Sequence, residues 1–306
     1  MGFSVPAVTF RDSARLGTND YEILIFGDKF GEGSILPDRT LAIHASSTVE
    51  KPEGVVTRDP AFGLPAVWVD GVQHDRARGL GYTLVDPITV LITHLSEVLK
   101  ANVGQLITRA ETTRLMESVR TRQTGLLEEL VPNVLTISDV QRVLQGLLAE
   151  GVPIRNIDLI VEVLADSGRH QKDPAALTET VRQRIGLAIC QSLRGSRDAL
   201  SVLTIEPALE ASIAQCLKTS DGASPFVLEP TMAEQFLRRL LTLAESMMRN
   251  NLMPVLLCGP DIRRHLKLFT RRALPRLAVI SLGEIPHSID LKSFGVVAVN
   301  SPTDAR

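Results

Sequence analysis

The chain has 306 residues, of which 44% are apolar, 22% charged and only 4% aromatic, and its formal net charge is −2. This length allows two or three compact units, because domains usually hold about 100–200 residues. A near-neutral charge provides no basic field for a phosphate backbone, and few aromatic side chains can stack on bases, so the composition argues against nucleic-acid binding. No run approaches the roughly 20 apolar residues that cross a bilayer, which predicts a soluble chain.

The cysteines and histidines predict no metal site. Cys190, Cys216 and Cys258 lie far apart and never form a CxxC pair. Since the N-terminus lacks a secretory signal, we expect reduced, mostly buried thiols in a cytosolic protein. The six histidines show no i, i+4 pairing. His94 lies on the apolar side of its expected helix, which favours a partly buried structural role.

The N-terminal part has short β-branched or aliphatic runs bounded by Gly and Pro, which predict strands. These runs are residues 7–10, 21–26, 41–44, 66–69 and 82–85. We expect a short helix over residues 71–78 and a loop over residues 46–60. Gly27, Gly31 and Gly33 match no phosphate-binding loop and are interpreted as part of a hairpin turn.

Helical patterns dominate the middle of the chain, starting at Asp86-Pro87, a favourable helix start. Ser138 and Gln141 fit a capping box that opens the first of three amphipathic helices. The third of these opens at Asp173-Pro174 and is expected to run toward residue 191. Three such helices joined by short turns predict a compact all-helical unit.

The last third alternates between strand and helix patterns. Strands are expected at residues 200–205, 254–258, 277–281 and 294–299, and helices at residues 207–217, 231–250 and 261–274. Thr231 and Glu234 fit a capping box for the longest of these helices. Strands separated by helices imply an α/β layer with a partly parallel sheet.

Known catalytic motifs are absent from the sequence. It holds no GxxxxGK[ST], GxGxxG, GxSxG or HExxH pattern. Only Cys258 suggests catalysis, because ligands favour the carboxyl ends of parallel strands, but the sequence places no base beside it. Arg264, Lys267 and Arg271 fall on one side of their helix, with Arg263 beside them; a solvated helix face is the default interpretation and a patch for an acidic partner the alternative.

Several longer segments, taken together and in order, carry a family resemblance. They are residues 59–68 (DPAFGLPAVW), 81–87 (GYTLVDP), 127–132 (LEELVP), 140–155 (VQRVLQGLLAEGVPIR) and 279–286 (VISLGEIP). The chain resembles the cytoplasmic region of type III protein-export gates, the FlhA/SctV (LcrD) family. The segment at residues 59–68 is most similar to the flagellar branch, that of FlhA.

The resemblance implies a multi-subdomain α+β fold. The first subdomain would comprise residues 1–37 and 87–106, and a small α/β second subdomain, residues 38–86, would be inserted into it. An all-helical third subdomain would span residues 107–186, and an α/β fourth subdomain residues 187–306. With short joints between them, the fourth subdomain is expected to swing against the second.

The resemblance also implies a role in protein transport and no enzymatic activity or cofactor. The expected function is a docking platform that binds export chaperone–substrate complexes and orders export in flagellar assembly. Export ATPase components are a further expected partner, and self-association into a ring, nonameric in the family, is a third. The full-length protein would be held at the cytoplasmic face of the bacterial inner membrane by an N-terminal membrane portion.

The resemblance places the chaperone-binding pocket on Asp59, Phe62 and Thr93. An exposed Phe62 would offer an apolar anchor beside the Asp59 carboxylate and the Thr93 hydroxyl. Ala45 stands where relatives often carry a proline, which leaves the shape of the pocket open. Three alternatives also stay open: an injectisome gate for virulence effectors, a structural ring subunit without cargo contact, and an α/β enzyme that uses Cys258.

Overall fold

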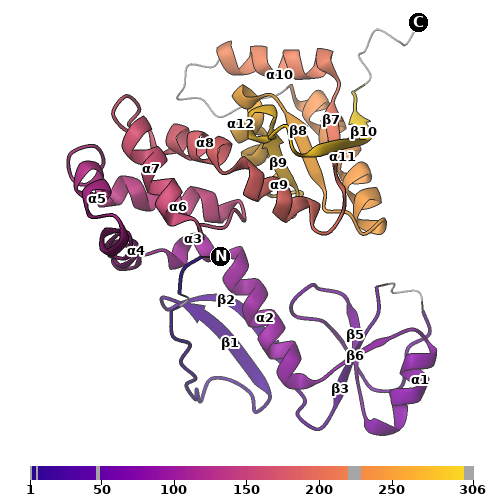
Figure 1. The fold of residues 1–306 in the computed structure, drawn as a ribbon. Coiled ribbons are helices and arrows are strands. Elements are labelled where there is room, and N and C mark those ends of the chain that lie inside the picture. Colours follow the sequence, from indigo (N-terminus) through magenta and orange to yellow (C-terminus); the bar gives the residue numbers. More distant parts are fainter. Residues whose placement is uncertain (1, 5, 46–48, 220–228, 300–306) are drawn as a thin grey trace, which may run out of the picture. The chain divides into compact units, whose positions relative to one another are not determined.

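The computed structural model describes residues 2–4, 6–45, 49–219 and 229–299, and it separates into two compact units (Figure 1). The smaller unit holds residues 4–107, and the larger unit holds residues 108–306 together with residues 1–3. The predicted mixed α/β beginning, helical middle and α/β end are confirmed. The division into four subdomains is finer than these two units and stays a prediction.

The smaller unit contains a two-stranded hairpin, a four-stranded sheet and helix α2. All strand pairs are antiparallel, and the sheet has the order β4-β5-β3-β6. The strands are β1 (Asp20–Ile25), β2 (Asp28–Ser34), β3 (Thr40–Ile43), β4 (Val55–Arg58), β5 (Pro65–Val69) and β6 (Thr83–Val85). The helices are η1 (Gly71–Gln73), α1 (His74–Gly79), α2 (Pro87–Ala101) and α3 (Val103–Leu106).

Helix α2 holds the hairpin and the sheet together (Figure 1). It begins as predicted, with the Asp86 carboxylate accepting a hydrogen bond from the Thr89 N–H at 2.9 Å and with Pro87 in its first turn. Its buried side chains, Val90, His94 and Val98, repeat at intervals of four residues. Val90 packs on one face of the sheet with Leu41, Ala66 and Trp68, while α1 covers the opposite face.

The larger unit begins with helices and continues as an α/β layer. The helices of its first part are α4 (Arg109–Arg122), α5 (Thr124–Leu130), α6 (Ile137–Ala149), α7 (Ile157–Ser167), α8 (Pro174–Arg184) and α9 (Gly186–Arg194). The elements of the layer are β7 (Ala199–Ile205), α10 (Pro207–Thr219), α11 (Pro230–Arg249), β8 (Val255–Cys258), α12 (Pro260–Thr270), β9 (Ala278–Ser281), η2 (Leu282–Glu284) and β10 (Asp290–Val297).

The four strands of the larger unit form a parallel sheet of order β10-β7-β8-β9. Parallel neighbours need crossover connections, and helices supply them here. A hydrophobic core lies against this sheet, around Leu203, Leu256 and Ile262, with Phe236 and Leu240 of α11 fully buried in it.

Two predictions about strands were wrong. Residues 7–10 form no strand; Val8 and Phe10 are exposed, so no partner strand covers the apolar run. The expected loop at residues 46–60 contains strand β4. Because β4 is an edge strand with both Val55 and Val56 exposed, it lacks the alternation of buried and exposed side chains that identifies a strand in sequence.

Helix starts and breaks also differ from the prediction in three places. The capping box of α6 uses Thr136 and Asp139 instead of Ser138 and Gln141. Helix α11 is capped by the Glu229 carboxylate, which accepts from two backbone N–H groups, and not by Thr231. The helix predicted from residue 173 to 191 breaks between α8 and α9, at Ile185.

Candidate functional site

The three predicted docking residues all belong to the smaller unit. Asp59 directly follows β4, Phe62 lies in the loop between β4 and β5, and Thr93 lies in α2. Phe62 is 46% exposed, whereas Asp59 is only 4% exposed and Thr93 is half-buried. The apolar side chain therefore faces solvent, and the two polar side chains lie deeper.

The β4–β5 loop holds Phe62 in place through its own hydrogen bonds. The Phe62 N–H donates to the Asp59 carboxylate at 2.7 Å. The Asp59 N–H donates to the Leu64 carbonyl at 2.9 Å, and the Gly63 N–H donates to the Asp59 carbonyl at 2.8 Å. Gly63 has φ +69, a left-handed conformation that favours glycine. Asp59 thus uses its carboxylate to shape the turn that presents Phe62.

A partly buried hydrogen bond connects the β1–β2 hairpin to α2. The Tyr21 hydroxyl lies 2.7 Å from Nδ1 of His94, and the two rings meet edge to face with centroids 5.7 Å apart. Burial, and to a smaller extent the Asp59 charge, raises the pKa of Tyr21 to about 12. The Asp59 charge also opposes the lowering of the pKa of His94, and His94 adjoins Thr93 in α2.

Sequence reasoning missed Tyr21, because only the folded hairpin brings it to α2. Gly31 and Gly33 of β2 are the sequence feature that could have indicated a close neighbour of this strand. A Cβ on Gly31 would lie 3.0 Å from the His94 ring, and a Cβ on Gly33 would lie 2.7 Å from the Tyr21 hydroxyl. The hairpin interpretation of this glycine cluster is confirmed, and close packing on α2 and Tyr21 is a second reason for glycine there.

We expect His94 to make the smaller unit sensitive to acid. Burial lowers the pKa of His94 below its ordinary value of 6.5, and the Asp59 charge only partly opposes this. The folded state therefore binds the proton less readily than the unfolded chain, so stability is retained above pH 6.5 and lost as the pH falls below it.

The measurement is urea unfolding at pH 7.5 and 5.5, followed by the fluorescence of Trp68, the chain's one tryptophan, which is buried in the smaller unit. The midpoint should fall at the lower pH, and His94→Gln should reduce that fall. An equal fall in both proteins would assign the acid sensitivity to other groups.

The other sequence candidates lose support as reactive sites. Cys258 is 2% exposed and its thiol donates to the Ile280 carbonyl at 3.7 Å. Burial raises the pKa of the Cys258 thiol above its ordinary value, whereas a nucleophilic cysteine needs a lowered pKa. Within the described part of the chain, no three His, Cys, Asp or Glu side chains are arranged to hold a metal ion.

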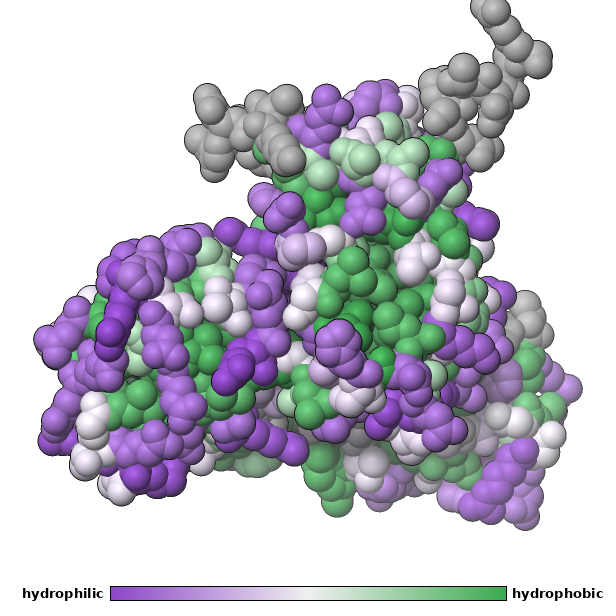
Figure 2. Space-filling model, turned by 45° about the horizontal axis from the view of Figure 1, so that its top comes forward, coloured by the Kyte–Doolittle hydropathy of each residue, from purple (hydrophilic) through white to green (hydrophobic). Residues whose placement is uncertain are grey.

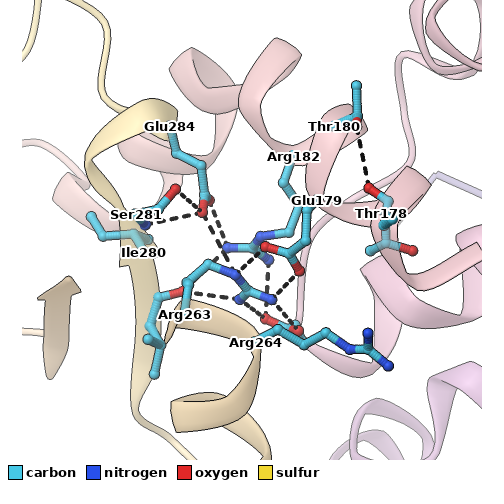
Figure 3. A network of polar contacts seen from close by, with 12 residues as sticks. Thr178, Glu179, Thr180, Arg182, Arg263, Arg264, Ile280, Ser281 and Glu284 are labelled. Carbon is cyan, nitrogen blue, oxygen red and sulfur yellow. Dashed lines mark hydrogen bonds and ion pairs between the residues drawn. The ribbon is translucent and has the colours of Figure 1, made fainter. Parts of the chain in front are cut away.

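The prediction that the cationic side chains of α12 form a solvated face is wrong for two of them. Arg263 is 0% exposed and Lys267 is buried, while Arg264 keeps a half-exposed side chain. Arg263 belongs to a network of ion pairs with Glu150, Glu179, Arg182 and Glu284 (Figure 3).

Exposure alone does not select a docking site on this protein. Figure 2 shows apolar side chains gathered at several places among hydrophilic ones on one face of the molecule. Scattered apolar side chains are normal on protein surfaces. Phe62 differs because its backbone N–H is bonded to the buried Asp59 carboxylate within a hydrogen-bonded loop. Among the helices formed by described residues, none is both long and apolar enough to cross a membrane.

Comparisons with known proteins identify the class to which this two-unit α/β fold belongs. The FHIPEP family model matches residues 1–290. The chain therefore belongs to the FHIPEP family, and the resemblance found in its sequence motifs is confirmed.

Comparisons with individual proteins and solved structures agree with this family assignment. The chain is 35% identical over 299 residues to the flagellar biosynthesis protein FlhA of Bacillus subtilis, covering 98% of the chain and 44% of that protein. It thus spans less than half of that relative. The Chlamydia pneumoniae CdsV structure matches with a TM-score of 0.81 at 25% identity, covering 97% of this chain and 86% of that one. Nonameric SctV-C from EPEC matches with a TM-score of 0.71 at 24% identity, covering 91% and 84%.

Proposed function

We propose that this chain is the docking domain of a type III protein-export gate and that it binds chaperone–substrate complexes in flagellar assembly. The observation that carries the proposal is the exposed Phe62, whose backbone N–H donates to the buried Asp59 carboxylate in a hydrogen-bonded loop. A fixed aromatic side chain loses little conformational entropy on binding, which suits an anchor for an apolar partner surface. Membership of the FHIPEP family supports the class of function.

The proposed roles of the three site residues differ. Phe62 is the contact residue, and Asp59 is a positioning residue because its buried carboxylate fixes the turn. Thr93, on α2, offers a hydroxyl to the same partner. His94 and Tyr21 hold α2 and the hairpin beneath this surface.

The proposal extends to assembly and place. We propose that copies of the domain associate into a ring, and the fold likeness to nonameric SctV-C supports this. Export ATPase components are proposed as a further partner. The domain would work at the cytoplasmic face of the bacterial inner membrane, joined to a membrane portion outside these 306 residues. It requires no catalytic step and no cofactor.

An injectisome gate is the second candidate, favoured by the likeness to CdsV and SctV-C structures. The flagellar assignment has the stronger support, because the FlhA relative is 35% identical and CdsV only 25%.

Calorimetric titration of the chain separates the two candidates. It should be titrated with a flagellar chaperone–substrate complex, with the same chaperone alone, and with an injectisome chaperone bound to its effector. We expect saturable binding of the flagellar complex and weaker or no binding of the injectisome complex. Binding of the injectisome complex alone would overturn the flagellar assignment, and binding of neither would overturn the docking function.

A further inference from the structure

A cluster of charged side chains is buried inside the larger unit, between its two halves (Figure 3). The helical half comprises α4 to α8, the α/β half comprises β7 to β10 with α10 to α12 and η2, and α9 connects the two. The charge cluster consists of Glu150, Glu179 and Arg182 from the helical half and Arg263 and Glu284 from the α/β half. Every member therefore pairs with a residue of the other half.

Arg263 of α12 has all its hydrogen-bond donors engaged. Its two terminal nitrogens donate to the two oxygens of Glu150, at 2.6 and 3.0 Å. Its Nε donates to Glu179 at 2.5 Å, Nη2 donates to the second oxygen of Glu179, and Nη1 donates to the Val279 carbonyl at 3.3 Å. An arginine has five N–H donors, and these five bonds use all of them. Arg263 thus fastens α12 to the end of α6 and to α8.

Arg182 of α8 makes the reciprocal connection. Its terminal nitrogens donate to Glu150 at 3.1 Å, to Glu284 of η2 at 2.7 Å and to the Val279 carbonyl of β9 at 3.3 Å. The other oxygen of Glu284 accepts from the Ser281 N–H at 3.0 Å. One arginine from each half therefore reaches into the other half, and the two share Glu150 and the Val279 carbonyl.

Three members of the charge cluster are almost fully buried, whereas the side chains of Glu150 and Glu179 are 18% and 23% exposed. Arg263 is 0%, Arg182 2% and Glu284 1% exposed. A pocket adjoins Glu150, Arg182 and Lys267. Burial alone would raise the pKa of Glu150, but the two arginines hold it below its ordinary value. The Glu150 carboxylate thus stays charged and paired.

The backbone is also closely fitted at this junction. A Cβ added to Gly186, the first residue of α9, would lie 2.0 Å from the Glu284 carbonyl oxygen. The Cys190 thiol of the same helix donates to that carbonyl at 3.7 Å. Residue 284 therefore meets the helical half through its side chain and α9 through its backbone.

We infer that the charge cluster latches the helical half and the α/β half into one rigid body. Sliding one half over the other would strip the fully buried Arg263 of both carboxylates, and a buried charge without partners is strongly disfavoured. A swing of the fourth subdomain, as the sequence led us to expect, would then carry the third subdomain with it.

Double electron–electron resonance spectroscopy, which measures the distance between two spin labels, tests the latch on the whole chain. Spin labels are placed at Glu162→Cys in α7 and Gln235→Cys in α11, both exposed. All proteins also carry Cys216→Ser, because Cys216 is partly exposed and could take up a spin label. Cys190 and Cys258 are buried and stay unchanged. We expect a single narrow distance distribution in this parent protein. Arg263→Met should broaden or split it.

Arg264→Met is the matched control. It removes the same type of side chain one residue along α12, but Arg264 is half-exposed and its ion pair to Asp173 is long, 3.9 Å. Figure 3 shows it extending away from the charge cluster. The distribution of this variant should equal that of the parent.

A second variant keeps the test decisive if Arg263→Met does not fold. Glu179→Gln preserves the shape of a partly exposed member and removes one of the two carboxylates on Arg263. It should give a distribution broader than that of the parent, with the circular dichroism of a folded protein. A folded Arg263→Met protein that keeps the parent's narrow distance distribution would overturn the latch. If Arg263→Met does not fold, a narrow distribution in folded Glu179→Gln would overturn it instead.

Discussion

Replacing Arg263 by methionine is expected to lower the free energy of unfolding of the larger unit by about 3–5 kcal/mol. The substitution keeps the bulk of the side chain but leaves the carboxylates of Glu150 and Glu179 facing each other without their shared cation. Urea unfolding followed by far-ultraviolet circular dichroism measures the effect. Fluorescence of Trp68 reports on the smaller unit in the same experiment, and its transition should stay in place.

Arg264→Met provides the control for stability as well, with an expected change within about 0.5 kcal/mol, as for most surface substitutions. A loss in Arg263→Met no larger than this would show that the charge cluster contributes little. The prediction concerns one missing partner. Removing every charge of the cluster and packing apolar side chains in its place could cost far less, because buried ion pairs gain little over a well-packed apolar core.

The contrast between α2 and α12 shows what the sequence can and cannot predict. The start of α2 was predicted correctly because its cap lies within three residues, between Asp86 and Thr89. Arg263 was wrongly expected in solvent, because the carboxylates that bury it lie 84 and 113 residues away in the chain. Local periodicity reports which face of a helix is apolar, and it carries no information about charges that distant carboxylates neutralise.

The candidate site shows the same division. Gly63 and Asp59 form a turn whose backbone–backbone bonds lie within residues 59–64, so the loop can be recognised from the motif DPAFGLP. The choice of Phe62 and Thr93 as a pair came from the family resemblance and from no spacing rule. Tyr21 and His94 are 73 residues apart in the chain, so no local sequence pattern predicts their contact.

Truncating Phe62 to alanine is expected to weaken binding of the flagellar chaperone–substrate complex by at least about 2 kcal/mol, or roughly 30-fold in Kd. Truncating an aromatic anchor at the centre of an interface to alanine commonly costs this much binding free energy. Phe62 is 46% exposed, so the fold should tolerate the change. The unfolding midpoint measured by Trp68 fluorescence should stay close to that of the wild-type chain.

The most direct measurement is a parallel calorimetric titration of the wild-type chain, Phe62→Ala and Phe26→Ala with the same complex. Phe26 is the matched control, since it is an exposed phenylalanine at the tip of the β1–β2 hairpin in the same unit. The docking account predicts that Phe62→Ala loses about 30-fold or more in affinity and that Phe26→Ala binds like the wild type. Wild-type affinity in Phe62→Ala, or an equal loss in both variants, would contradict it.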